Sequence, residues 1–252
     1  MTGPGTNSYL IGRGRRCLLD PGPDDDKQFA SLMTALGEGG LEAILVTHTH
    51  RDHSPLATRL QRQTGAELLG LPAPDAVGQD KSFQPTREWR HDHVLDLDGI
   101  RLRAVHTPGH VSNHLCYLLE EEKLLFTGDH VLEGTTPVIL PPDGNMTDYL
   151  NSLRYLKSLH LEWLAPGHGE LIADPVGAID GLCAHRLRRE EKIIAALTEL
   201  GQADEKALLR IVYDDIPANL LTIATKTQLA HLLKLQAEAR ATCTDGRWRL
   251  VD

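Results

Sequence analysis

Four side chains that can bind a metal ion stand close together in the segment 47–53, whose sequence is Thr-His-Thr-His-Arg-Asp-His. Imidazole nitrogens and carboxylate oxygens suit a borderline ion such as zinc. On a regular strand His48, His50 and Asp52 would share one face, and His53 would point the other way. All four can converge only if the chain leaves a strand, turns and begins a helix. An apolar run before the segment and a helix-like run from Leu56 favour that conformation.

Three further residues of ligand type follow in order, each in a short loop after a strand-like run. Glycine or proline precedes each of them, which permits sharp turns and close backbone approach. Loops at the strand ends of an open α/β sheet share one crevice. We therefore expect two adjacent metal sites and a carboxylate that bridges them. The first site would consist of His48, His50 and His110, and the second of Asp52, His53 and His168. The bridging carboxylate would be Asp129. Asp52 and Asp129 are the predicted catalytic carboxylates.

This ligand set resembles the metallo-β-lactamase superfamily, which carries an HxHxDH motif followed in order by a His, an Asp and a His. Asp20, in the segment Leu-Leu-Asp-Pro-Gly, resembles the first motif of that superfamily, where the Asp supports the histidine loop from behind. The resemblance spans about residues 5 to 170 and holds at seven of seven ligand positions. His114, four residues after His110, is expected to hydrogen-bond behind the ligands.

Longer segments of the sequence resemble the family of β-lactamase-like protein 2 and its bacterial relatives. The segments that carry this resemblance are Gly5–Leu10, Thr47–Ser54, Thr107–His110, Gly134–Thr136 and Tyr149–Leu153. It implies an αββα sandwich over residues 1–174, a winged-helix domain over residues 175–252, and zinc-dependent endonuclease action on single-stranded RNA. The sequence departs from the family at its start, because only four residues precede Gly5 where relatives carry a further strand.

The remaining pattern alternates strand-like and helix-like runs, which predicts a layered α/β domain. Strands are expected at residues 9–11, 17–19, 43–46, 67–69, 100–105, 114–119, 123–126 and 163–165, and helices at 28–36, 56–63 and 148–158. Helices at 175–200, 205–213 and 227–239 then precede a hairpin with an Asp245-Gly246 turn, which gives a winged-helix outline. From Asp204 to Asp252 there are seven basic and seven acidic residues. A duplex-DNA reader should have a basic face, so we expect a lid or a homodimer contact instead.

Bulk properties narrow the setting. The chain has 252 residues and a formal net charge of −9, which argues against bulk attraction to nucleic acid. Two dications would nevertheless neutralise much of the acidity of the site. No apolar run approaches the length of a membrane span, and the start of the chain has no apolar signal core. The four cysteines form no CxxC pair and are expected to be buried thiols in a reducing compartment. We therefore expect a cytoplasmic protein.

The predicted chemistry is hydrolysis. Two zinc ions, with manganese or iron as alternatives, would hold a hydroxide that attacks a phosphodiester. The same centre serves thioesters, so the ligands indicate a reaction class and leave the substrate open. A glyoxalase II-type thioesterase is the main alternative, although its basic and tyrosine glutathione motif is not found. A one-iron dioxygenase and a non-enzymatic metal-binding scaffold with a winged-helix interaction module are the others.

Four residues are candidates for contacts with single-stranded RNA, the expected substrate. Arg186, Arg188 and Arg189 lie on one predicted helix, where they could contact flanking phosphates or form a solvated face. Tyr149 is a candidate for stacking on a base.

Overall fold

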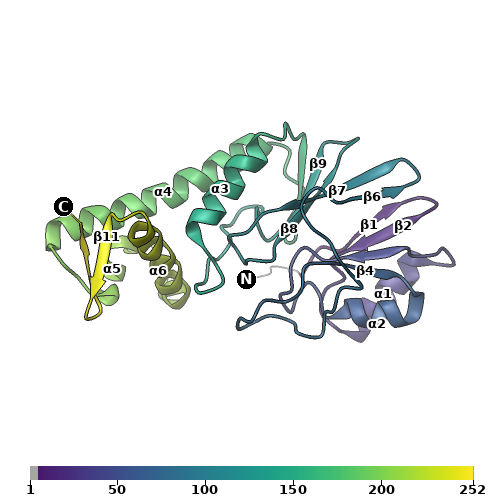
Figure 1. Cartoon of the computed structure of the whole chain (residues 1–252), viewed down its shortest axis with the longest axis horizontal. Coiled ribbons are helices and arrows are strands. Elements are labelled where there is room, and N and C mark those ends of the chain that lie inside the picture. Colours follow the sequence, from purple (N-terminus) through teal and green to yellow (C-terminus); the bar gives the residue numbers. More distant parts are fainter. Residues whose placement is uncertain (1–4, 252) are drawn as a thin grey trace.

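The protein, seen here as a computed structural model that describes residues 5–251, begins with two five-stranded sheets packed face to face (Figure 1). The first sheet contains, in spatial order, β1 (Tyr9–Gly12), β2 (Arg16–Leu19), β3 (Ala43–Leu45), β4 (Glu67–Gly70) and β5 (Arg87–Glu88). The second contains β10 (Trp163–Pro166), β9 (Leu124–Gly128), β8 (Leu115–Leu119), β7 (Ile100–His106) and β6 (Val94–Leu97). Both sheets mix parallel and antiparallel pairs.

Helices cover the outer faces of the two sheets. α1 (Asp26–Leu36) and α2 (Leu56–Thr64) pack on the first sheet, and α3 (Met146–Lys157) and the start of α4 (Pro175–Leu200) pack on the second. Alternation along the strands explains these layers, because successive side chains point to opposite faces. In β2, for example, Leu18 joins the cluster under the helices, whereas Cys17 and Leu19 join the cluster between the sheets. The result is the expected αββα sandwich.

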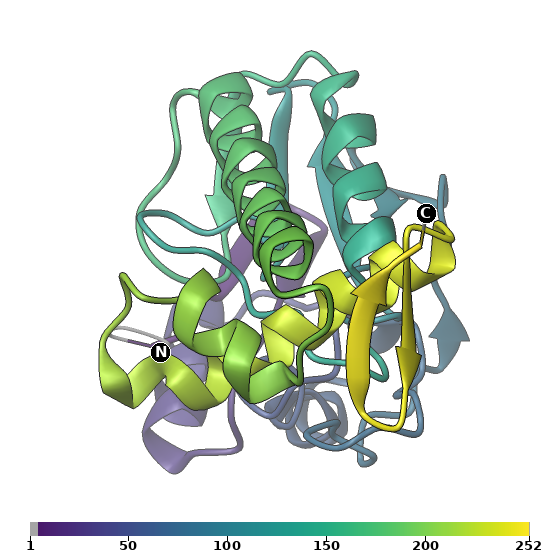
Figure 2. The same ribbon diagram turned by 90° about the vertical axis from the view of Figure 1, so that its left-hand side faces the viewer.

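A winged-helix domain follows. It contains α5 (Glu205–Val212), the short 3-10 helix η1 (Ala218–Leu220), α6 (Leu221–Ala237) and a hairpin of β11 (Ala241–Thr244) and β12 (Arg247–Leu250). Figure 1 and Figure 2 show these elements gathered around the C-terminal end of α4. Ile179 and Leu182 of α4 lie in the core of the second sheet, whereas Ile193 and Leu197 lie in the core of the winged helix. α4 thus contributes to the cores of both domains. The domain boundary expected between residues 174 and 175 therefore stays a prediction.

Every strand and helix expected from the sequence is present, and apart from α6 the ends differ by at most two residues. β5 and β6 were missed. The dipeptide Asp98-Gly99, whose two residues both have positive φ in the structure, was a readable signal for the hairpin of β6 and β7. α6 begins at Leu221, six residues before its expected start at residue 227. The β-branched residues Thr222 and Ile223 lower the helix propensity of this segment. The good helix former Ala224 is buried there and favours the helix.

Other expectations have simpler outcomes. Cys17 and Cys116 are buried free thiols as expected, whereas Cys183 and Cys243 are partly exposed. Among residues 5–251, no helix is both long and apolar enough to cross a membrane. The segment before Gly5 lies outside the described residues, and with it the question of a preceding strand.

Candidate metal centre

The loop between β3 and α2 brings its four ligand side chains to one place. The carboxylate of Asp20, at the end of β2, accepts hydrogen bonds from the backbone nitrogen and the hydroxyl of Thr47, both at 2.7 Å. These bonds fix the point where the chain leaves β3. The backbone nitrogens of His53 and Ser54 then donate to the carbonyl of His50 at 3.0 and 3.2 Å, which closes a turn before α2. The expected sequence of strand, turn and helix is therefore what lets the four side chains converge.

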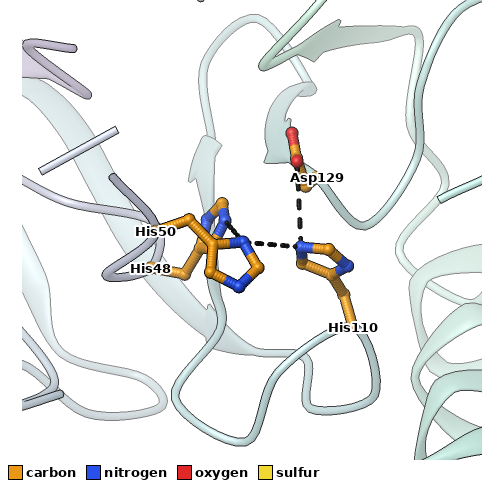
Figure 3. Close-up of side chains that lie close together, drawn as sticks. All are labelled: His48, His50, His110 and Asp129. Atoms are coloured by element: carbon orange, nitrogen blue, oxygen red, sulfur yellow. Dashed lines mark hydrogen bonds and ion pairs between the residues drawn. The ribbon is translucent and has the colours of Figure 1, made fainter. Parts of the chain in front are cut away.

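A first group of ligand atoms comes from three loops. Nδ1 of His50 lies 2.9 Å from Nε2 of His48 and 3.1 Å from Nε2 of His110. Oδ2 of Asp129 lies 3.7 Å from Nε2 of His110. Figure 3 shows the three imidazoles facing one another, with the carboxylate beside His110. Each of the four residues offers one ligand atom, and these atoms lie within 4.8 Å of one another.

A second group lies directly beside the first. It consists of Asp52, His53 and His168. Nε2 of His168 lies 3.4 Å from Oδ2 of Asp52. Oδ1 of Asp129 faces this group, at 3.4 Å from Nε2 of His53 and 3.3 Å from Nε2 of His168. The two oxygens of Asp129 therefore point to different groups, which is the geometry expected of a bridging carboxylate.

The donor set fits two divalent cations. Nε2 of His53, Nε2 of His168 and Oδ1 of Asp129 are buried without a hydrogen-bond partner among the described residues. Leaving a buried polar atom unsatisfied costs about 1–3 kcal/mol, so three such atoms that lie together indicate a cation-binding site. Imidazole and carboxylate donors match zinc and related ions.

The electrostatics of the ligand side chains favour the same interpretation. Burial holds the pKa of His48 well below its usual range, and burial with the neighbouring His110 lowers the pKa of His50 to about 4. Both rings are therefore neutral, as metal ligands must be. Burial alone would lower the pKa of His53, but the carboxylates of Asp129 and Asp20 raise it well above its usual range. The two carboxylates therefore favour positive charge beside His53, which suits a bound cation.

The ring nitrogens on the far side of the centre are held by polar partners. Nδ1 of His53 donates to Asp20 Oδ2 at 2.9 Å, Nδ1 of His110 to the carbonyl of Val138 at 2.7 Å, and Nδ1 of His168 to the carbonyl of Gly5 at 2.9 Å. These bonds fix each ring so that Nε2 faces the centre. The structure places Asp20 where the sequence resemblance put it.

His114 and His130 have different surroundings. Nε2 of His114 accepts from the backbone nitrogen of Asp129 at 3.2 Å, so its Nδ1 carries the proton and donates to the Thr107 hydroxyl at 2.9 Å. His114 therefore holds Asp129 in place from behind. His130 packs against Tyr149 and belongs to neither ligand group.

Glycines make room for this packing. At Gly128, with a φ of +47°, a Cβ would lie 2.7 Å from the Thr47 hydroxyl and 2.8 Å from His114 Nε2. At Gly167 a Cβ would lie 2.8 Å from His53 Cε1 and 2.9 Å from Asp129 Oδ1. Both positions therefore require glycine, because any side chain would displace a ligand or its support.

Three of the four candidate substrate contacts are wrong as proposed. Tyr149 is fully buried, and its hydroxyl donates to the carbonyl of His130 at 3.1 Å, so it cannot stack on a base. Arg186 is only 2% exposed and donates to the carbonyl of Pro137. Arg189 donates to the carbonyl of Val212 at 2.7 Å and pairs with Asp215 at 2.8 Å. Arg188 alone is exposed. Whether these side chains are exposed depends on which faces of α3 and α4 pack against neighbouring elements, and helical spacing in the sequence does not reveal those faces.

Comparison with known proteins agrees with the fold and the centre. A model of the metallo-beta-lactamase superfamily matches residues 1–168, and one of the beta-lactamase associated winged helix domain matches residues 205–248. The chain is 32% identical over 253 residues to the beta-lactamase-like protein 2 homolog of Drosophila melanogaster, covering 95% of this chain and 85% of that protein.

Two further likenesses extend the comparison. The chain is 32% identical over 231 residues to an atrochrysone carboxyl ACP thioesterase of Aspergillus fumigatus, covering 86% of this chain and 70% of that protein. The crystal structure of a metallo-beta-lactamase family protein from Thermus thermophilus matches with a TM-score of 0.79 at 25% identity, over 98% of this chain and 94% of that one. With its sandwich, its paired ligand groups and its C-terminal winged helix, the chain belongs to the metallo-β-lactamase superfamily.

Proposed function

We propose that the protein is a binuclear zinc hydrolase that cleaves single-stranded RNA internally. The observation that carries the hydrolase assignment is the position of Asp129, whose two oxygens face two adjacent groups of His and Asp ligands. The RNA substrate is supported by the resemblance to the group of β-lactamase-like protein 2, which extends over most of this chain.

The side chains have distinct tasks in this reaction. When bound, two dications supply a nucleophile at neutral pH and polarise the attacked bond. His48, His50 and His110 would hold one cation as neutral rings, and Asp129 would offer one oxygen to each group. The side chain of Asp52 is 35% exposed, compared with 13% for Asp129. Burial would raise the pKa of Asp52, but His168, whose Nε2 lies 3.4 Å from Oδ2 of Asp52, keeps the pKa below its usual value. Asp52 is therefore an ionised carboxylate that water can reach, which suits a proton acceptor.

The recessed position of the centre favours a single strand. His48, His53, His110 and His168 are all buried. A flexible strand can bring one phosphate into such a site, whereas a duplex holds its phosphates on a stiff surface. Arg188 is the remaining candidate for a flanking phosphate, since Arg186 and Arg189 are engaged within the protein.

Thioester hydrolysis is the second candidate, and a specific observation favours it. A relative that covers 86% of this chain is an ACP thioesterase by name. Arg186 and Arg189 are engaged within the protein and cannot contact RNA phosphates, which also weakens the case for a long RNA substrate. The metal centre would act in the same way on a thioester carbonyl.

One experiment separates the two functions. Purified protein of measured metal content is incubated with a labelled single-stranded RNA, with the same RNA as a duplex, with S-lactoylglutathione and with an acyl-phosphopantetheine thioester. We expect internal cuts in the single strand, little cutting of the duplex and no rapid thioester hydrolysis. Asp129→Asn, prepared in parallel, controls for contaminating nuclease. Intact RNA together with rapid hydrolysis of either thioester would replace the RNA proposal with the thioesterase.

A further inference from the structure

A cavity lies away from the ligand groups, where the winged-helix domain meets the first domain. Its volume is about 160 Å³, and it is bounded by the loop of residues 135–138, by α4 and by the segment from Tyr213 through the start of α6. Figure 2 shows α6 crossing below α4 on this side of the molecule. Ile216, Leu220 and Ile223 form an apolar wall, and Arg186 and Tyr213 contribute polar groups.

Arg186 is a buried cation without a counter-ion. It is 2% exposed, and within residues 5–251 no carboxylate oxygen lies within 4.0 Å of its guanidinium. It donates to the carbonyl of Pro137 and lies 5.4 Å from the centre of the Tyr149 ring, while its Nε has no hydrogen-bond partner. Arg189, which lines the same cavity, is neutralised by Asp215. Burying an unpaired charge is costly, so Arg186 is the group that requires an anion.

Two further polar atoms in the cavity wall lack partners among the described residues. The hydroxyl of Tyr213 is unpartnered in a residue that is 7% exposed, and so is Nδ1 of the half-buried His185. Burial together with Arg186 and Arg189 lowers the pKa of His185 to about 4, which reports a positive potential at this place. Glu190, one turn further along α4, is held by Lys234 at 2.9 Å and does not neutralise Arg186.

The size and chemistry of the cavity define its ligand. A cavity of about 150 Å³ in another protein accommodates a benzene ring, so this one can take a ring of that size. A guanidinium binds carboxylates and phosphates through paired hydrogen bonds. We propose that the cavity binds a small organic carboxylate, with the anion on Arg186 and the Tyr213 hydroxyl and an apolar body against Ile216, Leu220 and Ile223.

This site is linked to the metal centre through adjacent peptide groups. The carbonyl of Pro137 accepts from Arg186, and the carbonyl of the next residue, Val138, accepts from Nδ1 of His110 at 2.7 Å. The inference does not rest on RNA or thioester hydrolysis, because none of the seven ligands lines the cavity.

Benzoate is the probe that tests this site. Calorimetric titration of the metal-loaded protein should show binding of benzoate and at least about tenfold weaker binding of benzamide, the neutral isostere, because the amide cannot form charge-assisted hydrogen bonds to the guanidinium. Arg186→Gln should lower benzoate affinity to a similar extent. Arg188→Gln is the matched control on the exposed face of the same helix and should bind benzoate like the wild type.

Further arms keep the result interpretable. Ala224→Leu fills the cavity without changing charge and should also abolish binding, which covers the case that Arg186→Gln does not fold. Hydrogen exchange should slow in residues 213–227 when benzoate is added, also in Asp129→Asn, which separates this site from carboxylate binding at the metals. Equal binding of benzoate and benzamide, or benzoate binding that survives both cavity variants, would overturn the proposal. Binding of inorganic phosphate but not benzoate would overturn the apolar half and assign the site to a phosphate group.

Discussion

Asp20 accepts a hydrogen bond from Nδ1 of His53 at 2.9 Å, although 33 positions separate the two residues in the sequence. The same carboxylate accepts from the backbone nitrogen and the hydroxyl of Thr47. One side chain at the end of β2 therefore ties down both ends of the histidine loop, and it turns Nε2 of His53 toward Asp129.

The first prediction follows from this contact. Asp20→Asn should reduce affinity for the second metal by about 10–100-fold, the usual effect of losing a hydrogen-bond partner behind a ligand. Asn also tolerates the positive φ of 49° at this position, so the change removes charge and leaves the backbone alone. Metal titration against a competing chelator measures the effect. Asp24→Asn, exposed in the same loop, should titrate like the wild type, and equal behaviour of the two variants would refute the assigned role.

The second prediction concerns the bridge. The wild type should bind close to two metal equivalents per chain. Asp129→Asn should weaken metal binding at both positions and lower turnover by at least about 100-fold, which is the upper end of the effect of losing a residue that only supports a ligand. Asparagine lacks the charge and the second oxygen that face the two groups. His130→Leu is the neighbouring control and should keep its metal, because His130 lies outside both groups. Metal loss confined to the His130 variant would show that Asp129 is not the ligand.

Gly167 gives a steric test. Gly167→Ala should displace His53 or Asp129 and reduce the metal content toward one equivalent, because the new methyl group would lie within 3.0 Å of both. Gly181→Ala, in the open on α4, meets nothing within 4 Å. It should keep both metals and stabilise the fold by about 0.5–1 kcal/mol, the usual gain in a helix interior. Full metal content in Gly167→Ala would contradict the packing described here.

Glu190 gives a test of stability and pH. Glu190→Gln should destabilise the fold by about 2 kcal/mol, because the buried Lys234 loses a charged hydrogen-bond partner and keeps only Glu238, which is 36% exposed. Glu191→Gln, on the exposed side of α4, should have little effect. Burial would raise the pKa of Glu190, but His231 and Lys234 lower it to about 2 from an ordinary value of 4.5. A depressed pKa stabilises the fold above pH 4.5, and this contribution is lost as the pH falls toward 2.

Urea unfolding of metal-stripped protein checks the pH dependence. The difference in unfolding free energy between wild type and Glu190→Gln should be constant from about pH 7 to about pH 5 and should shrink below that. A difference that grows as the pH falls would have the wrong sign for a depressed carboxyl pKa.

The sequence predicts the metal centre far better than its surroundings. Four of the seven candidate ligands lie within six residues of one another, and the other three follow the ends of β7, β9 and β10 within four residues, so local patterns in the sequence indicate them. Arg186 and Tyr149 were misjudged because their exposure depends on which helix faces pack against which loops. Gly109 shows how close that packing is, since a Cβ there would lie 2.3 Å from the Cα of Tyr149. No helical periodicity contains this information.

α4 has a consequence for how the molecule can move. This helix of 26 residues runs from one hydrophobic core into the other, and its proline stands at its first position, where it does not interrupt the helix. The winged-helix domain therefore has no hinge at this connection. Swinging it toward or away from the metal centre would require α4 to break between its two anchored halves, so we expect the two domains to keep their relative orientation.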